Sequence, residues 1–221
     1  KLGNINSERI INANNEPQNW LSHGRDYHEQ RFSPLNQINL ETINKLQLEW
    51  SLDMGTTRGL EATPIVDNGI MFVSSTWSVV HAVDAKTGKE LWVYDPDVPR
   101  SWARKVCCDV VNRGVAVWEG QVYFGTIDGR LISLDTKTGK KIWEINTLID
   151  TDKDYTITGA PRVANGKVYI GNGGADMGGV RGYVSAYNTK NGNLEWRFFT
   201  VPGDPSLPFE HPELEMASKT W

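Results

Sequence analysis

The chain has 221 residues, of which 39% are hydrophobic, and it carries a formal net charge of −4 at pH 7. Acidic and basic residues are interspersed without a basic stripe, which excludes nucleic acid as a partner. The apolar runs fall far short of the roughly 18 residues of a membrane-spanning helix, and no signal peptide is visible, so the chain is expected to stay where it is made or to be a processed, mature form.

The chain begins with a polar segment. Residues 1–40 are predicted to form a partly helical lead-in, and residues 41–221 are predicted to form the repetitive part that follows. The nine Trp and 21 Gly are unusual for this length, and most of the pattern in the second part depends on them.

A tryptophan motif repeats along residues 41–221. AxDxxTGxxxW ends at Trp92, recurs with Ser in place of Ala ending at Trp143, and recurs as AxNxxNGxxxW ending at Trp196. The repeat is therefore about 50 residues long, and Trp50 lies one shorter step before Trp92. We interpret these tryptophans as packing residues that fill the gap between neighbouring repeats.

A turn motif recurs with about the same spacing as the tryptophans. VDNG, VWEG and VANG end at Gly69, Gly120 and Gly166, and each lies between two short apolar segments. Asn-Gly and Thr-Gly between such segments predict β-hairpins, because Gly accepts the positive φ of a tight turn.

Each repeat therefore predicts four short antiparallel strands, and the period indicates an all-β protein, a β-propeller. Residues 41–221 are expected to supply about four blades. Because that number does not close a ring, we expect the propeller to be incomplete. A long insertion that contains DPDVPRSWARKVCCDVV and a second one, NTLIDTDKDYTITG, are candidate functional loops, and the Pro-rich end after residue 200 is predicted to be loop-like.

The two cysteines, Cys107 and Cys108, are adjacent. A disulfide between them would enclose essentially no loop, so its value would be local, as a stiff, flat, sulfur-rich surface. The alternative is a pair of reduced cysteines that is buried as small hydrophobic side chains. The pair alone does not decide between these alternatives.

The sequence resembles the pyrroloquinoline quinone (PQQ)-dependent alcohol dehydrogenases, and most closely the soluble quinohaemoprotein type. The resemblance runs through almost the whole chain. It is carried by WLSHGRD, RFSPLNQIN, TRGLEATP, the cysteine pair, Arg113-Gly114, TITGAP, GNGGADMGGVRG and the closing KTW. This family is built on an eight-bladed propeller with tryptophan-docking repeats, which the resemblance implies for this chain.

The resemblance also implies a set of site residues. Cys107 and Cys108 match a disulfide that packs against the planar cofactor, and Arg113 matches a residue that pairs with a cofactor carboxylate. The other matching cofactor-binding positions are Glu61, Thr158, Gly173, Gly174 and Ala175. Asp176 stands where the family usually has a Glu that binds Ca²⁺, and it is the candidate metal ligand. A lanthanide is the other candidate metal.

The implied activity is oxidation of a primary or secondary alcohol, with electrons passed to a cytochrome. No catalytic base is identified within the chain, a haem c domain is implied only outside it, and a periplasmic location follows from the resemblance. The alternative function is a non-catalytic propeller scaffold for protein–protein interaction. A hydrolytic or metal enzyme is disfavoured, because the four histidines show no metal-binding spacing and no G-x-S-x-G elbow occurs.

Overall fold

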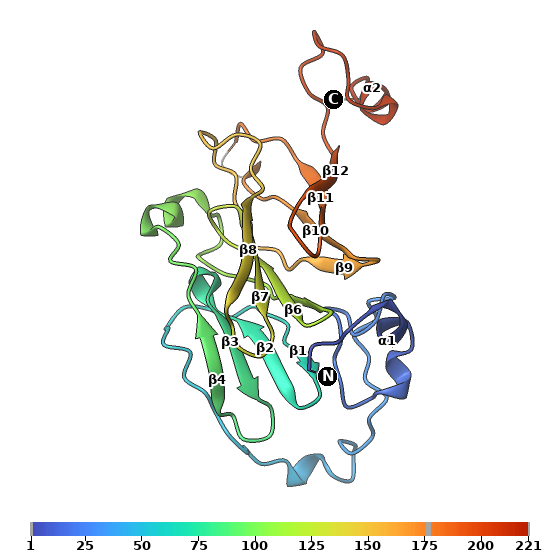
Figure 1. The fold of residues 1–221 in the computed structure, drawn as a ribbon, viewed down its shortest axis with the longest axis vertical. Helices are drawn as coiled ribbons and strands as arrows, with labels where there is room; N and C mark the ends of the chain where they lie inside the picture. The colour runs from blue at the N-terminus through green and yellow to red at the C-terminus, as the bar shows by residue number, and fades with distance from the viewer. Residues whose placement is uncertain (1, 176–177, 221) are drawn as a thin grey trace.

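The computed structural model describes residues 2–175 and 178–220. Their strands form three four-stranded antiparallel sheets, each built from consecutive strands (Figure 1). The first sheet contains β1 (Ile65–Asp67), β2 (Ile70–Ser74), β3 (Val80–Asp84) and β4 (Glu90–Tyr94). The second contains β5 (Ala116–Trp118), β6 (Gln121–Gly125), β7 (Arg130–Asp135) and β8 (Lys141–Asn146). The third contains β9 (Arg162–Ala164), β10 (Lys167–Gly171), β11 (Tyr183–Asn188) and β12 (Leu194–Phe199).

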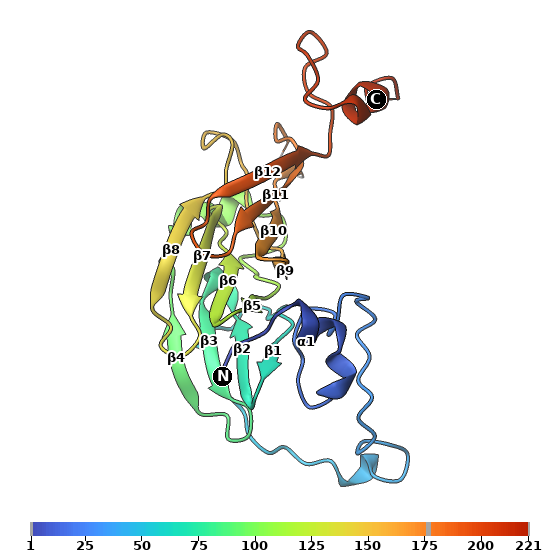
Figure 2. The ribbon, with the colours of Figure 1, turned by 45° about the vertical axis from the view of Figure 1, so that its right-hand side comes forward.

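These sheets are successive blades of a β-propeller, which confirms the predicted fold class. They lie side by side: in Figure 2 the last strands β4 and β8 of the first two sheets lie at the left edge and β1 and β5 to their right, and in the third sheet β12 lies above β9. Three complete blades are formed within the described residues, where the sequence predicted about four. The segment around Trp50 is not a strand in this structure, because it forms no β-sheet hydrogen bonding with any other described segment.

The first hairpin of each blade has the predicted turn. In all three blades both central residues have positive φ, and the pairs are Asn68-Gly69, Glu119-Gly120 and Asn165-Gly166. Two positive φ angles define a type I′ turn, whose twist matches that of the flanking strands. The middle pair shows that this position accepts Glu where the other two blades have Asn.

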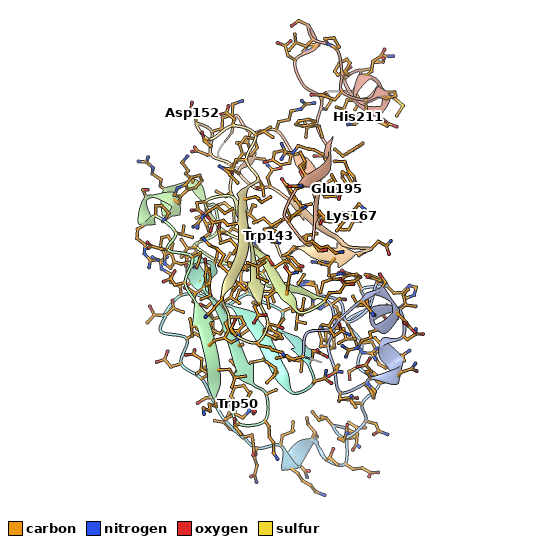
Figure 3. All side chains as sticks on the ribbon, in the orientation of Figure 1. Trp50, Trp143, Asp152, Lys167, Glu195 and His211 are labelled. Atoms are coloured by element: carbon orange, nitrogen blue, oxygen red, sulfur yellow. A yellow bond between two sulfur atoms is a disulfide. The ribbon has the colours of Figure 1, made fainter. Side chains whose placement is uncertain are left out.

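The tryptophans dock on the neighbouring repeat. The indole N–H of Trp50 donates to the Ala85 carbonyl at 3.1 Å, and that of Trp143 donates to the Thr189 carbonyl at 3.0 Å (both tryptophans are labelled in Figure 3). Trp92 makes the equivalent bond to Thr136 at 3.0 Å. Each of these rings lies against the glycine of the next turn motif: Gly88 under Trp50, Gly139 under Trp92 and Gly192 under Trp143. The tryptophans are therefore packing residues, as interpreted from the repeat.

The main hydrophobic core lies within and between the blades. Its largest fully buried side chains include Phe72, Tyr123, Phe124 and Leu131. Equivalent aromatic pairs recur in the three blades: Phe72 with Trp92, Tyr123 with Trp143, and Tyr169 with Trp196, with ring centroids 5.8–6.0 Å apart. The blades thus share one packing pattern as well as one topology.

The lead-in contains α1 (Ser7–Ile11) and the 3₁₀ turn η1 (Ala13–Asn15), and η2 (Ile43–Lys45) follows before the first blade. A buried ion pair ties the lead-in to the first blade, because the guanidinium of Arg9 lies 2.7 Å from the fully buried carboxylate of Asp67. Trp20 and Val66 also exchange two main-chain hydrogen bonds. The division at residue 40 stays a prediction.

The end of the chain differs from the predicted loop. Residues Pro212–Ala217 form a short helix, α2, which lies beyond β12 in Figure 1. Proline suits the first helical position because its missing N–H is not needed there, and Glu213 and Glu215 in the first turn favour the positive end of the helix dipole. No helix among the described residues is long and apolar enough to cross a membrane.

Candidate functional site

Cys107 and Cys108 are joined by a disulfide. They follow the 3₁₀ segment η4 (Arg100–Lys105) on the long insertion between β4 and β5, and both residues are exposed. The alternative of two buried, reduced cysteines is therefore wrong, and the pair presents a sulfur surface outward. Of the two alternatives that the sequence left open, the structure has the disulfide between adjacent cysteines.

The loop that follows the disulfide is fixed between two blades by a buried asparagine. The side-chain oxygen of Asn112 accepts hydrogen bonds from the Ser74 hydroxyl at 2.7 Å and from the Gly114 N–H at 3.1 Å. Its amide nitrogen donates to the Gly125 carbonyl at 2.8 Å. Because Ser74 ends β2 and Gly125 ends β6, this one side chain holds the loop to both sheets.

Arg113 joins the segments that lead into the first strands of the three blades, β1, β5 and β9. Its Nη2 lies 3.0 Å from Oε2 of Glu61, and its Nη1 donates to the Thr158 hydroxyl at 2.6 Å. Its main-chain N–H also donates to the Thr158 carbonyl at 2.9 Å, while the Thr63 N–H donates to the Arg113 carbonyl at 3.3 Å. Arg113 thereby contacts two other predicted site residues, and each of the three lies in the segment before a different blade.

The glycine-rich segment lies against the second insertion. Gly173 and Thr156 exchange two main-chain hydrogen bonds of 2.6 and 3.1 Å. Gly174 has φ of +119°, and a Cβ there would lie 2.2 Å from the Asp154 carbonyl oxygen, so only glycine fits. Ala175 is exposed, and the predicted metal ligand Asp176 lies outside the described residues.

Six of the predicted site residues line one pocket. Its walls combine the disulfide, Arg113, Thr158, Gly173 and Gly174 with four residues that sequence reasoning missed: Lys105, Val106, Val111 and Thr156. Glu61 contacts the pocket residue Arg113, and Ala175 directly follows Gly173 and Gly174, which form the glycine wall of the pocket. The pocket holds only about 70 Å³, whereas pockets for small molecules usually enclose about 300–1,000 Å³. The pocket that the described residues form is therefore smaller than a typical small-molecule site.

Two of the missed residues carry polar groups. Thr156 alternates with Thr158 in TITG, and an extended segment directs alternate side chains to the same face, so this threonine could have been found from the sequence. Lys105 precedes the cysteine pair by two residues, but its position in the pocket depends on contacts with the second insertion, which the sequence does not reveal.

The donor set suits a flat, anionic ligand. Arg113 and Lys105 supply positive charge, the two threonines supply hydroxyls, and the disulfide supplies a polarisable surface for a π-system. The glycines permit close approach of the main chain. Residues 2–175 and 178–220 contain no group of three or more His, Cys, Asp or Glu side chains that could hold a metal ion.

Similar proteins match this chain over nearly its whole length. The chain is 62% identical over 202 residues to a quinohaemoprotein alcohol dehydrogenase, ADH IIB, from Pseudomonas putida, a match that covers 91% of this chain and 29% of that protein. It is 56% identical to a 1-butanol dehydrogenase (cytochrome c) from Thauera butanivorans, with 91% and 29% covered.

Solved structures show the same fold. The structure of ADH-IIG from Pseudomonas putida matches with a TM-score of 0.97 and 54% identity, covering 99% of this chain and 32% of that chain. A europium-containing methanol dehydrogenase matches with a TM-score of 0.83 and 38% identity, covering 90% and 34%.

The chain thus spans about 30% of the length of these relatives. The family model for the PQQ glucose/ethanol/alcohol dehydrogenase β-propeller domain matches residues 20–220. The chain belongs to the PQQ-dependent alcohol dehydrogenase family, of whose β-propeller domain it contains a part.

Proposed function

We propose that the full-length protein is a quinohaemoprotein that oxidises primary or secondary alcohols with PQQ and passes the electrons to a cytochrome c. The observation that carries this proposal is the exposed Cys107–Cys108 disulfide, which shares one pocket with Arg113 and the glycine segment. The relatives named as alcohol dehydrogenases support the substrate class, and the 1-butanol dehydrogenase (cytochrome c) supports the acceptor.

The residues of the pocket would bind and orient PQQ. The disulfide is a rigid wall for one face of the ring system, and the Arg113 guanidinium is suited to a carboxylate because of its planar pair of donors. Glu61 fixes that guanidinium and, with Thr158, offers hydrogen bonds at the rim. Gly173, Gly174 and Ala175 allow the main chain to approach. PQQ, when bound, supplies the redox chemistry, and the protein supplies binding and orientation.

We propose Asp176 as a ligand of the metal that accompanies the cofactor. Ca²⁺ is the first candidate, because it takes oxygen ligands. A lanthanide is the second, since a europium-containing methanol dehydrogenase is 38% identical to this chain. A haem c would belong to a part of the protein outside this chain.

We propose a periplasmic location. A vicinal disulfide on the surface of the protein needs an oxidising compartment to persist. In a non-catalytic scaffold, by contrast, neither the disulfide nor the Arg113–Glu61 ion pair beside it would have a function.

The test is reconstitution of the full-length protein with PQQ and either Ca²⁺ or a lanthanide, followed by dye reduction with a series of primary and secondary alcohols. We expect alcohol-dependent reduction that requires PQQ. Inactivity with every alcohol and both metals would overturn the dehydrogenase proposal and favour the scaffold.

A second test concerns the disulfide alone. When the denatured protein is treated with a thiol reagent without reductant, Cys107 and Cys108 are expected to stay unlabelled, because they are joined by a disulfide. Two free thiols assigned to these residues by mass spectrometry would contradict a stacked disulfide.

A further inference from the structure

Lys105 connects the disulfide loop to the second insertion. Its ammonium nitrogen lies 3.1 Å from Oδ1 of Asp154 and 3.5 Å from the Lys153 carbonyl oxygen. The same ammonium lies 4.4 Å from the centroid of the Trp102 ring, which is within reach of a cation–π interaction. The side chain is 17% exposed, so three partners hold this cation in one place.

The far end of this contact is held against the glycine wall. The Asp154 carbonyl oxygen occupies the space beside Gly174 that a Cβ would take. Two residues later, Thr156 pairs with Gly173 through two main-chain hydrogen bonds. Between them Tyr155 is buried, and its hydroxyl accepts a hydrogen bond from the Arg181 N–H at 2.9 Å. The segment 153–156 therefore links Lys105 to the glycine wall.

We propose that Lys105 is a positioning residue. Its ion pair with Asp154, called the clasp, fixes the Cys107–Cys108 disulfide (the sulfur wall) relative to Gly173 and Gly174 (the glycine wall). The clasp thereby sets the shape of the cofactor pocket. This inference rests on the proposed PQQ site. The disulfide lies on the insertion between β4 and β5, whereas the two glycines lie on the connection between β10 and β11, so the covalent chain alone does not fix their separation. A half-buried ion pair between the two insertions supplies that constraint near the pocket.

A direct role of the Lys105 charge in binding the anionic cofactor makes a different prediction. If Lys105 acted by its charge alone, Asp154→Asn would leave affinity unchanged or raise it, because it removes a competing negative charge. If the clasp matters, Lys105→Met and Asp154→Asn weaken binding alike. The double variant then resembles either single variant, since both break one interaction.

The experiment titrates full-length apoprotein variants with PQQ and follows the quenching of tryptophan fluorescence. We expect each single variant and the double variant to lose about fivefold in affinity, the scale of a partly exposed ion pair. Lys105→Arg keeps the charge and the contact with the ring, and is expected to stay within about twofold of the parent. Lys153→Met is the matched control, because its side chain is exposed and its contribution to the contact is a main-chain carbonyl.

A second readout needs no cofactor. In apoprotein treated with a phosphine reductant, Lys105→Met and Asp154→Asn are expected to release the Cys107 and Cys108 thiols severalfold faster than the parent and the Lys153→Met control. Unchanged release rates and unchanged PQQ affinity in both variants would overturn the clasp, as would tighter binding by Asp154→Asn. Failure of the parent apoprotein to bind PQQ would instead reject the proposed function, while the reduction rates would still test the clasp.

Discussion

The guanidinium of Arg113 and the carboxylate of Glu61 form an ion pair, with Nη2 and Oε2 3.0 Å apart. The two residues precede the first strands of different blades, β5 and β1. The two side chains are 40% and 41% exposed. An ion pair at that exposure adds only about 0–1 kcal/mol to stability. Its value is therefore orientation: with Thr158 on the other guanidinium nitrogen, Arg113 is held in place before a ligand arrives.

Replacing Arg113 is expected to affect PQQ binding far more than stability. Arg113→Ala should lower PQQ affinity about 100-fold in the full-length protein, because charge-assisted hydrogen bonds are the strong ones. Arg113→Lys keeps the charge but loses the planar pair of donors. Its PQQ affinity should therefore lie between that of Arg113→Ala and that of the parent. Fluorescence titration of the apoproteins measures both.

Arg58→Ala is the matched control, because Arg58 is also a half-exposed arginine paired with a carboxylate, that of Asp109, but it does not line the pocket. It should leave the affinity within about twofold of the parent, as expected for a surface ion pair. Equal affinity of Arg113→Ala and the parent would show that Arg113 does not contact the cofactor.

Gly174 is expected to tolerate no side chain. Gly174→Ala places a Cβ 2.2 Å from a main-chain carbonyl and holds alanine at φ +119°, so it should destabilise the protein by about 2 kcal/mol or more. Gly159→Ala is the matched control, because its Cβ would meet no atom within 4 Å. Urea unfolding of the two variants checks this, and a midpoint for Gly174→Ala equal to that of Gly159→Ala would contradict the close approach.

Much of the fold could be predicted from the sequence because local chemistry repeats. Gly69, Gly120 and Gly166 have positive φ in the first hairpin of each blade. Because that conformation favours glycine, each of these turns could be recognised in the sequence. The docking tryptophan and the turn glycine are both encoded within the repeat, so the contact between neighbouring blades was visible as well. Three complete blades were formed where about four were expected, because Trp50 docks like a blade residue without belonging to a described strand.

The candidate site could be predicted only in part. The adjacent cysteines were noticeable by themselves, but their role and the choice of Arg113 and the glycines came from the resemblance to a family, whereas composition and period identified only the propeller. Lys105 was missed because its partner, Asp154, lies in another insertion, and sequence patterns do not report which long loops meet. The short helix α2 was missed because a Pro-rich segment favoured a loop, although Pro212 begins that helix.

The docking glycines are expected to matter more than turn glycines in open space. Gly139 has φ +67°, and a Cβ there would lie 2.7 Å from the Trp92 ring, whereas Gly69 has φ +80° and open space around it. Gly69→Ala should cost about 1 kcal/mol for the left-handed conformation alone. Gly139→Ala adds an overpacking cost and should reach about 3 kcal/mol. Equal losses in urea unfolding would show that the tryptophan is not held against the glycine.

The lead-in contains a histidine that should make stability depend on pH. Burial lowers the pKa of His23 below its usual value of about 6.5, and the nearby positive charges of Arg162 and Arg31 lower it further. Its Nδ1 is buried and has no hydrogen-bond partner among the described residues. The folded state therefore resists protonation of this ring, while the unfolded state does not.

The sign of the pH effect follows from these two pKa values. Between the folded and the unfolded pKa of His23, the unfolded chain binds more protons, so stability falls as pH decreases through that window. His23→Asn should therefore lose less stability than the parent between pH 8 and pH 5, as measured by urea unfolding at each pH. His28→Asn is the matched control, since His28 is exposed in the same segment, and it should follow the parent curve. A His23→Asn curve parallel to that of the parent would mean that His23 takes up its proton equally well in both states.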